Sequence, residues 1–361
     1  MGNLILPSLE IHNFRGFQHL QIERLGRVNL IVGKNNIGKS SLLEALQLYA
    51  HRGAFSSIIE MLEVREEGIL YGNILAALKY LFYGRKEITP ETQPITIGPL
   101  STPEKTLTLS VSWDLTELKD GKLQTRPLQV GEVQNDGFLS PRFNIHREGH
   151  TISFPLEASL PSTMLKQNSK EINSFFVAGS GLSRRQLGDL WDKVALGERE
   201  AEDDVLNALR IVAPGVERLY FVGDAQNGRE RIPVVRVSEI DGPLPLRSLG
   251  DGIQHILSIA IALVNAKDGI LLIDEVENGI HYIALFEIWQ LIFRIAHRLN
   301  IQVFATTHGW DCLEAFQAAA QEDQHEEALL LRLDRRKNGI TATLFDERKM
   351  AIATREQIEV R

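Results

Sequence analysis

Residues 33–41, Gly-Lys-Asn-Asn-Ile-Gly-Lys-Ser-Ser, have the residue types and spacing of a loop that wraps around a phosphate chain. The glycines let the backbone approach an anion closely, and the backbone N–H groups can donate hydrogen bonds to phosphate oxygens. We expect Lys39 to reach the β- and γ-phosphates of a nucleotide and the Ser40 hydroxyl to hold Mg²⁺. The predicted nucleotide-binding residues of this loop are Gly33, Asn35, Asn36, Gly38, Lys39, Ser40 and Ser41.

The segments on either side of the loop fit that role. Residues 28–32, Val-Asn-Leu-Ile-Val, are typical of a buried strand, and residues 40–46 have the composition of a helix. A helix that begins at the loop points its N-terminus at the bound phosphate. The alternative, a plain glycine turn between a strand and a helix, leaves three further motifs of the chain unexplained.

Two adjacent carboxylates, Asp274 and Glu275, follow a second apolar run at residues 270–273. Such a run predicts a buried parallel strand whose C-terminal end meets the site. Asp274 would hold Mg²⁺ through water, and Glu275 would orient and deprotonate the attacking water. The alternative is a strand that ends in an ordinary charged turn.

A third predicted buried strand, Gln-Val-Phe-Ala at residues 302–305, is mostly apolar and ends in two threonines and His308. This strand follows the strand that bears the carboxylates after one helix. His308 could sense the γ-phosphate through a hydrogen bond there, so we count it with Glu275 and Lys39 as a candidate catalytic residue. Otherwise, a lone histidine at a strand end is usually an ordinary polar group with its hydrogen bond satisfied.

Ser248, Gly250 and Gly252 form a second polar loop, which precedes an apolar helical run at residues 256–264. A polar loop at a helix N-terminus is a second potential anion site. Because one nucleotide does not need two such sites in one chain, the simplest explanation is a dimer in which this loop closes over the ATP of the other subunit. Taken alone, the loop is also compatible with a helix cap.

Arg15 lies in the turn Asn-Phe-Arg-Gly-Phe of residues 13–17, between two runs that alternate apolar and polar side chains as half-buried strands do. Its guanidinium could contact a phosphate or stack on the base, so Arg15 is a candidate nucleotide-binding residue. The alternative is a surface arginine in a turn.

The composition narrows the class of protein. The 361 residues include 39 basic and 47 acidic side chains, which gives a net charge of −8 and excludes a surface that is basic throughout. Cys312 is the only cysteine, so an internal disulfide is excluded and a reducing compartment is expected. The N-terminus lacks a signal-peptide pattern, and the longest apolar run is too short to span a bilayer. We therefore expect a cytoplasmic protein with no membrane contact.

The pattern along the chain predicts three segments. Residues 1–110 would form an N-terminal ATPase lobe with the phosphate loop. Residues 111–244 would form an inserted segment, with strands of an antiparallel sheet that spans about 90–160 and then helices over about 183–212. Residues 245–361 would form a C-terminal ATPase lobe with the second polar loop, the two carboxylates and His308.

In this order the motifs resemble those of ABC-type ATPase heads of the group that includes RecF, SMC proteins and the overcoming-lysogenization-defect (OLD) family. The resemblance covers residues 1–50 and 245–320 and is greatest to the OLD-like ATPases. It implies an α/β fold, a P-loop ABC-type ATPase head with a mostly parallel core sheet, an added antiparallel sheet and a short helical insertion. It also implies Mg²⁺-dependent hydrolysis of ATP, closure of a homodimer or higher oligomer on ATP, and a preference for ATP over GTP.

Three departures from the family pattern matter. The second polar loop corresponds to the signature loop but reads Ser-Leu-Gly-Asp-Gly, which argues against a membrane transporter. The loop glutamine that usually contacts Mg²⁺ has no clear counterpart, and Gln93 is the candidate for it. Residues 309–361 contain no Asp-x-Asp, the pattern of the TOPRIM nuclease domain of OLD proteins, so we expect no nuclease activity in this chain.

Three hypotheses follow from the motifs and the resemblance. The first is an ATPase that controls a separately encoded effector, a TOPRIM-like nuclease or a toxin, in bacterial anti-phage defence. The second is a RecF-like DNA-repair ATPase that clamps DNA, and the net negative charge of the chain counts against it. The third is a scaffold that binds ATP with negligible turnover, against which the intact Glu275 counts.

Overall fold

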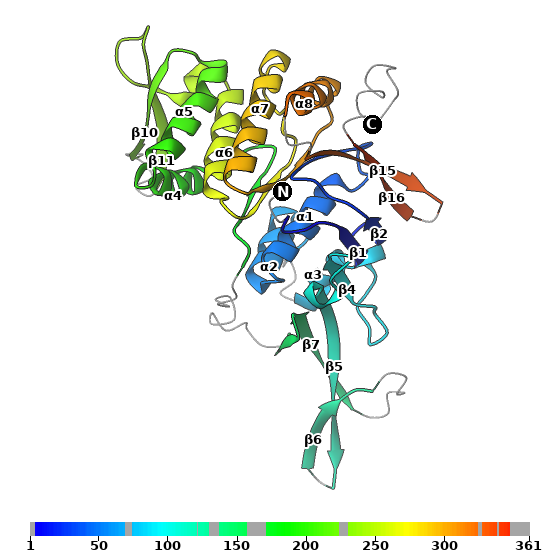
Figure 1. Ribbon diagram of the computed structural model, residues 1–361. Helices are drawn as coiled ribbons and strands as arrows, with labels where there is room; N and C mark the ends of the chain where they lie inside the picture. Colours follow the sequence, from blue (N-terminus) through cyan, green and yellow to red (C-terminus); the bar gives the residue numbers. More distant parts are fainter. Residues whose placement is uncertain are drawn as a thin grey trace.

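The chain folds around three β-sheets with helices packed between and beside them (Figure 1). The computed structural model describes residues 4–68, 74–120, 122–129, 137–156, 171–223, 230–323, 327–337 and 339–346. Across these ranges, no helix is both long and apolar enough to cross a bilayer.

The central sheet contains the three apolar runs that the sequence predicts as buried strands. All neighbouring strands in it pair in parallel, except for an antiparallel hairpin at one edge. Strands that are covered on both faces are apolar along their length, and each of the three runs is fully buried. The mostly parallel core of the predicted fold is therefore confirmed. The strand order from edge to edge is β16 (Gly339–Phe345), β15 (Ala328–Arg336), β3 (Val28–Val32), β14 (Gln302–Thr306), β13 (Ile270–Ile273) and β9 (Ser174–Val177).

Helices cover both faces of the central sheet, and alternate residues of its strands supply a separate hydrophobic cluster on each face. Leu30 and Val303 belong to one cluster, whereas their neighbours Ile31 and Phe304 belong to the other. This follows from the pleat, which points successive side chains of a strand to opposite faces. One cluster includes residues of α6 (Gly252–Asn265), α7 (Tyr282–Arg298) and α8 (Trp310–Glu322), and the other includes residues of α1 (Lys39–Ala50) and α2 (Phe55–Val64).

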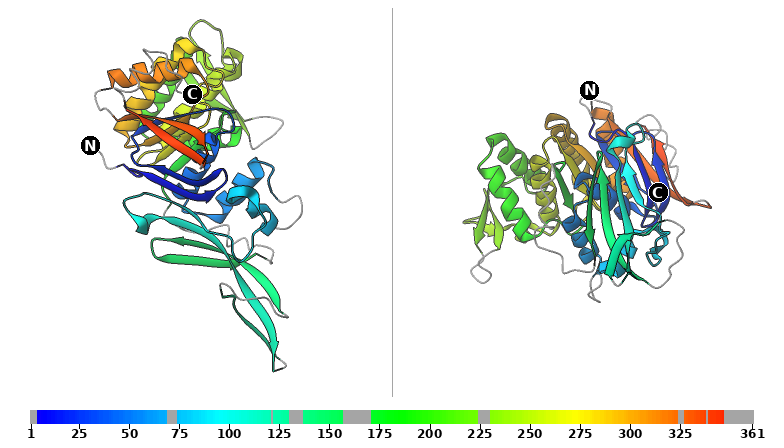
Figure 2. Two further views of the ribbon diagram at one scale, coloured as in Figure 1. Left: turned by 90° about the vertical axis from the view of Figure 1, so that its right-hand side faces the viewer. Right: turned by 90° about the horizontal axis from the view of Figure 1, so that it is seen from below.

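The second sheet is antiparallel and extends away from the helices (Figure 1). It begins with the N-terminal hairpin, which lies beside the hairpin at the edge of the central sheet (Figure 2). Residue 110 falls within one of its strands, so the proposed division of the chain at that residue runs through a single strand. The path is β2 (Phe17–Ile22), β1 (Leu9–Phe14), β4 (Ile95–Gly98), β5 (Leu107–Lys119), β7 (Phe138–Arg147) and β8 (His150–Pro155), and β6 (Lys122–Pro127) pairs with β5.

A third, small sheet and two amphipathic helices pack against α6 on the far side from the phosphate loop. The first of these helices begins with a capping box, in which the Ser183 and Gln186 side chains bond each other's backbone N–H groups. This part corresponds to the predicted helical insertion. It consists of α4 (Arg184–Ala195), α5 (Arg199–Val212), β10 (Val216–Gly223), β11 (Arg231–Val237) and β12 (Leu244–Pro245). The remaining short helices are α3 (Ile74–Leu78), η1 (Lys79–Leu81), η2 (Tyr83–Arg85), η3 (Pro103–Lys105) and η4 (Leu246–Leu249).

The reactivity of the Cys312 thiol can be used to measure whether α8 stays packed against the central sheet. Its side chain is fully buried, and this burial raises the pKa of the Cys312 thiol to about 12. Because the thiolate is the reactive form, we expect the native protein to resist alkylation by iodoacetamide at about pH 8. Mass spectrometry should find the modification only after unfolding in guanidinium. Rapid alkylation of the native protein would show that α8 does not stay packed in solution.

Candidate nucleotide-binding site

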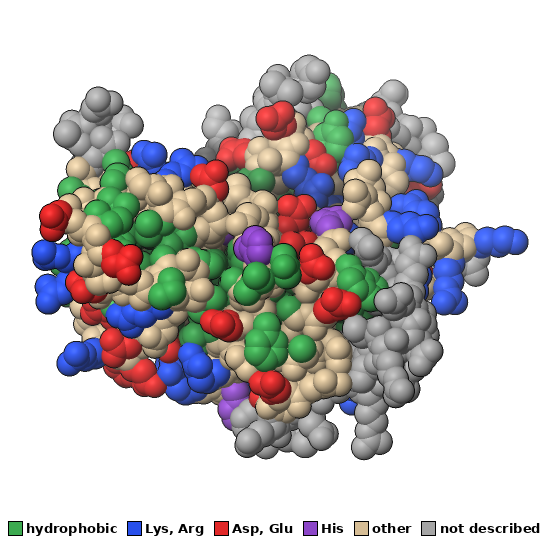
Figure 3. Space-filling model, turned by 90° about the horizontal axis from the view of Figure 1, so that it is seen from above, with side chains coloured by type: hydrophobic (Ala, Val, Ile, Leu, Met, Phe, Trp, Pro, Cys, Tyr) green, Lys and Arg blue, Asp and Glu red, His purple; other side chains and the backbone are tan. Residues whose placement is uncertain are grey.

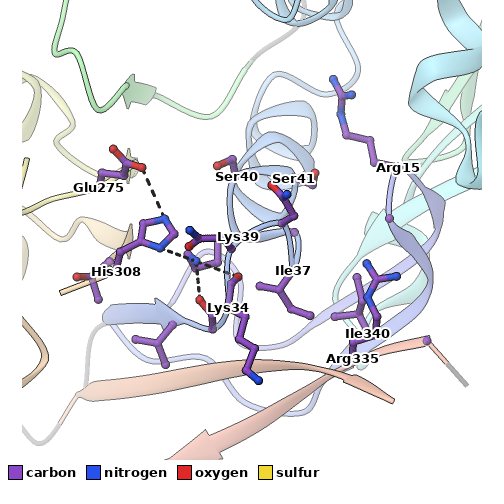
Figure 4. Close-up of a pocket in the computed structure, with 18 of the residues that line it drawn as sticks. Arg15, Lys34, Ile37, Lys39, Ser40, Ser41, Glu275, His308, Arg335 and Ile340 are labelled. Atoms are coloured by element: carbon purple, nitrogen blue, oxygen red, sulfur yellow. Dashed lines mark hydrogen bonds and ion pairs between the residues drawn. The ribbon is translucent and has the colours of Figure 1, made fainter. Parts of the chain in front are cut away.

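A pocket of about 1710 Å³ opens beyond the carboxyl ends of β3 and β14 (Figure 4). This is where open α/β sheets place their ligands, because the loops that follow parallel strands meet at this edge. Residues from the two ends of the chain line the pocket together, including Glu275 and His308. The whole predicted phosphate loop is also part of the lining, namely Gly33, Asn35, Asn36, Gly38, Lys39, Ser40 and Ser41.

The phosphate loop curls around the ammonium group of Lys39. Lys39 Nζ donates hydrogen bonds to the carbonyl oxygens of Gly33, at 2.6 Å, and Lys34, at 3.3 Å. It also lies 3.3 Å from Nδ1 of His308 (Figure 4). The lysine is thus held at the centre of the loop, where a cation can meet phosphate oxygens.

Burial and neighbouring charges act on Lys39 in opposite directions, and the backbone before α1 turns sharply. Burial lowers the pKa of Lys39, while the charges of Asp274, Glu275 and Glu277 act in the opposite direction and favour its charged form. Gly38, which precedes α1, has a φ of 112°, a left-handed conformation that a residue with a Cβ adopts only with strain. The second glycine of the motif therefore allows the sharp turn from the loop into the helix.

The side chain of Asp274 contacts the side chain of Ser40. The Ser40 hydroxyl donates to Asp274 Oδ2 at 2.9 Å, and the Thr306 hydroxyl donates to Asp274 Oδ1 at 2.5 Å. Hydroxyl and carboxylate oxygens are the ligands that Mg²⁺ prefers, so this pair fits the predicted metal site. Thr306 is a residue that the sequence analysis did not single out, although it stands within the Thr-Thr-His motif.

Glu275 has an unusual backbone conformation, with a φ of 52°. Only a few per cent of residues other than glycine have positive φ, and such residues concentrate at functional sites. The Thr306 hydroxyl fixes this conformation by accepting a hydrogen bond from the Glu275 N–H at 2.9 Å. Thr306 therefore bridges both carboxylate residues and directs their side chains apart, Asp274 to Ser40 and Glu275 towards the pocket.

His308 lies between Lys39 and Glu275 (Figure 4). Its Nε2 is 3.6 Å from Glu275 Oε1, and its Nδ1 faces the lysine. A second carboxylate, Glu277, fixes the backbone here, since Glu277 Oε1 accepts hydrogen bonds from the N–H groups of His308, at 2.7 Å, and Gly309, at 3.0 Å. No motif in the sequence marks Glu277, and its position two residues after Glu275 is the one signal that points to it.

Arg15 reaches the rim of the pocket, but carboxylates surround its guanidinium. Arg15 Nε lies 2.6 Å from Glu44 Oε2, and Arg15 Nη1 lies 2.6 Å from Glu67 Oε2. The arginine is 4% exposed, and Arg65 also pairs with Glu44. These contacts link the first turn, α1 and the end of α2. The contact of Arg15 with a phosphate or base stays a prediction, and these partners would compete with it.

The signature loop lies away from this pocket in the single chain. Ser248 and Gly250 are exposed, and neither they nor Gly252 are among the residues that line the pocket. The loop instead touches the segment that follows the two carboxylates, because Gly252 packs against the backbone of Gly279. Its predicted contact with the ATP of a second subunit stays a prediction.

Gly252→Ala should disrupt this contact. A Cβ at residue 252 would lie 1.8 Å from the carbonyl oxygen of Gly279, so one backbone must move. We expect the free energy of unfolding to fall by about 1–3 kcal/mol, as for other overpacked sites, and the melting temperature to fall with it. Gly223→Ala is the matched control, since no atom lies within 4 Å of its Cβ. Equal melting temperatures for both variants would contradict this packing.

Basic side chains outside the sequence motifs also line the pocket. Arg335 and Arg336 are the last residues of β15, Lys337 follows them, and Arg85 comes from η2. Gln93, the candidate for the Mg²⁺-contacting glutamine, is not among the lining residues, and its carbonyl accepts a hydrogen bond from Asn13 Nδ2. These basic residues do not belong to a spaced motif. The folded edge hairpin brings the first three to the phosphate loop, and η2 brings Arg85.

Two protein families match this chain by sequence. The family described as "AAA domain, putative AbiEii toxin, Type IV TA system" matches residues 138–308. A family described as an AAA ATPase domain matches residues 5–122. The two matches together cover the phosphate loop, the two carboxylates and His308.

Individual relatives agree with these matches. An ATP/GTP phosphatase of Helicobacter pylori is 21% identical and covers 88% of this chain and 89% of its own length. The DNA replication and repair protein RecF of Clostridioides difficile is 33% identical over 85 residues, which are 23% of this chain and 22% of RecF. An SMC head solved with the C-terminal winged-helix domain of ScpA has the same fold, with a TM-score of 0.52 at 11% identity over 95% of this chain and 99% of that one.

Proposed function

We propose that this chain, an ATPase with the fold of an SMC head, is an ABC-type head of the RecF and SMC group that hydrolyses Mg²⁺-bound ATP within an ATP-driven dimer. Through this dimer it would control a separate effector. The observation that carries the proposal is the convergence, at one pocket, of side chains that suit phosphate binding, metal binding and water activation. Lys39, Ser40, Glu275 and His308 line the pocket, and Asp274 accepts a hydrogen bond from Ser40.

In the proposed reaction each of these side chains has one role. Lys39 and the N–H groups of its loop bind the phosphates, and Ser40 and Asp274 would hold Mg²⁺, which neutralises charge on phosphate oxygens when bound. Glu275 accepts a proton from the attacking water. His308 lies 3.3 Å from Lys39 Nζ and 3.6 Å from Glu275, which supports a hydrogen bond from its ring to the γ-phosphate.

Exposed groups beside the signature loop support the dimer. Tyr282 and Ile283, at the start of α7, are 59% and 68% exposed. They follow Gly279 closely in the chain, and Gly279 contacts Gly252. Exposed aromatic and aliphatic side chains next to a glycine-rich loop are features of an interface core, so we propose that a second copy of the chain covers this surface.

The dimer is tested in a variant that cannot turn ATP over. In a Glu275→Gln background, light scattering should give a doubled mass with ATP and Mg²⁺ and a monomer without them. Adding Ser248→Arg should prevent the doubling, because it places a bulky charge in the signature loop, while the monomer still binds a fluorescent ATP analogue. Ser101→Arg, at an exposed loop of the antiparallel sheet, is the control.

Two outcomes of this experiment would contradict the proposed dimer. A mass that doubles in spite of Ser248→Arg would overturn the action of the signature loop across the dimer. An unchanged mass on ATP in the Glu275→Gln background would overturn ATP-driven dimerisation itself.

Control of an effector is the less direct part of the proposal, and it is supported by the match to the family described with AbiEii and a type IV system. We propose a TOPRIM-like nuclease or another toxin, in anti-phage defence, as the effector. The purified chain should then leave DNA intact with Mg²⁺ or Mn²⁺, and cleavage by the chain alone would contradict a separate effector. A cytoplasmic location is also proposed, and the single cysteine supports it.

A second candidate function is a RecF-like clamp on DNA, which the match to RecF favours. Arg335, Arg336 and Lys337 are exposed and could meet phosphates of a nucleic acid. On the face shown in Figure 3, however, acidic and basic side chains are interspersed. A gel shift of duplex DNA that needs ATP and weakens steeply with salt would favour this function. Loss of that gel shift in Arg336→Ala/Lys337→Ala would assign DNA binding to the surface that carries these two residues.

A further inference from the structure

Two histidines face each other across the N-terminal hairpin, on a surface that the proposed ATPase reaction does not use. His12 of β1 and His19 of β2 are direct partners in the antiparallel register. Side chains at such paired positions have Cβ atoms about 4.5–5.5 Å apart, so they extend from the sheet side by side. The two rings stack, with centroids 4.2 Å apart and an angle of 7° between their planes.

A carboxylate of the same strand completes this group. Glu10 Oε1 lies 2.9 Å from His19 Nε2 and 3.3 Å from His12 Nε2. The three ligand atoms all lie within 4.8 Å of one another. In the described part of the chain, this is the one group of three His, Cys, Asp or Glu side chains with ligand atoms this close together.

This geometry is close to that of a metal site. With metal–ligand distances of about 2.0–2.2 Å, tetrahedral ligand atoms are separated by about 3.3–3.6 Å. The observed separations from Glu10 Oε1 to the ring nitrogens, 3.3 Å for His12 and 2.9 Å for His19, are near that spacing. To bind a cation, the stacked rings would rotate so that both Nε2 atoms point at it. The side chains are 35% exposed for Glu10, 43% for His12 and 49% for His19, which leaves access and room for a water ligand.

We propose that Glu10, His12 and His19 form a binding site for a divalent transition-metal cation of the Zn²⁺ class. Two imidazole nitrogens with one carboxylate oxygen suit Zn²⁺, whereas Mg²⁺ and Ca²⁺ prefer sites built of oxygen alone. The site is therefore distinct in chemistry from the pair formed by Ser40 and Asp274.

The position of the site couples it to the turn that carries Arg15. His12 and His19 lie on either side of this turn, and both Arg15 and Gly16 line the nucleotide pocket. The hairpin also packs beside β16 of the central sheet (Figure 2). A cation held by both strands fixes the base of the turn, so it stabilises the native hairpin without entering the pocket.

Titration calorimetry with ZnCl₂ tests the site directly. We expect the wild-type protein to bind Zn²⁺ at a site whose affinity falls by about tenfold or more in His12→Gln and in His19→Gln, because each variant leaves two of three ligands. The rise in melting temperature with Zn²⁺ should be lost in the same variants. His146→Gln is the matched control, since His146 is exposed on β7 of the same sheet and bonds only to Thr151 in the described contacts.

A second measurement needs no variant. Zn²⁺ should protect His12 and His19, but not His146, from modification by diethyl pyrocarbonate, as read by mass spectrometry of peptides. Equal modification of all three histidines with Zn²⁺ present would overturn the site, as would an unchanged Zn²⁺ affinity in the folded His12→Gln/His19→Gln protein.

Discussion

Replacing Glu275 by Gln should stop ATP turnover while leaving nucleotide binding intact. The backbone of Glu275 has a fixed conformation at the pocket, and its carboxylate Oε1 lies 3.6 Å from His308 Nε2. An amide of the same shape keeps the packing but cannot accept a proton from water, and loss of a general base costs about 10²–10⁴-fold in rate. Phosphate release from ATP measures the turnover, and binding of a fluorescent ATP analogue measures the affinity.

Glu287→Gln is the matched control for this experiment. Glu287 is exposed on α7, outside the pocket, so the same chemical change there should preserve turnover. Turnover in Glu275→Gln equal to that of wild type would exclude Glu275 as the base. It would also exclude the proposed use of this variant to accumulate an ATP-bound dimer.

Lys39→Ala should remove most of the affinity for ATP. A hydrogen bond to a charged group contributes about 1.5–3 kcal/mol, so its loss weakens binding by between about tenfold and about a hundredfold. The effect has a second source, because Lys39 Nζ also holds the loop through the carbonyls of Gly33 and Lys34. Turnover should therefore fall even at saturating ATP, since the loop no longer keeps its shape.

Lys193→Ala, on the exposed face of α4, provides the comparison with an equal loss of charge. It should bind ATP as the wild type does. If Lys39→Ala and Lys193→Ala bind ATP equally well, the phosphates do not meet Lys39, and the assignment of this loop as the nucleotide site is wrong. The melting temperature of Lys39→Ala without nucleotide separates a loss of contact from a loss of fold.

The elements that position the site could be predicted because their signals are local. Each of the three buried strands is a mostly apolar run, and each ends at residues proposed to do chemistry, so the carboxyl edge of the parallel sheet could be inferred without a structure. The phosphate loop matches a motif of fixed spacing, in which the glycines and the lysine act on one phosphate chain. The pair of Asp274 and Glu275 could be proposed for the metal and the water because it directly follows a buried strand.

The sequence by itself determined which residues are candidates for the ATPase site, but the tertiary structure decided how they and their neighbours are held. Thr306 and Glu277 position the two carboxylate residues and His308 through hydrogen bonds between separate strand ends, which no spacing predicts. Arg15 meets Glu44 and Glu67 only once α1 and α2 pack beside the first hairpin. Local patterns fix which elements form, whereas partners far apart in the chain depend on packing, and packing is a property of the whole fold.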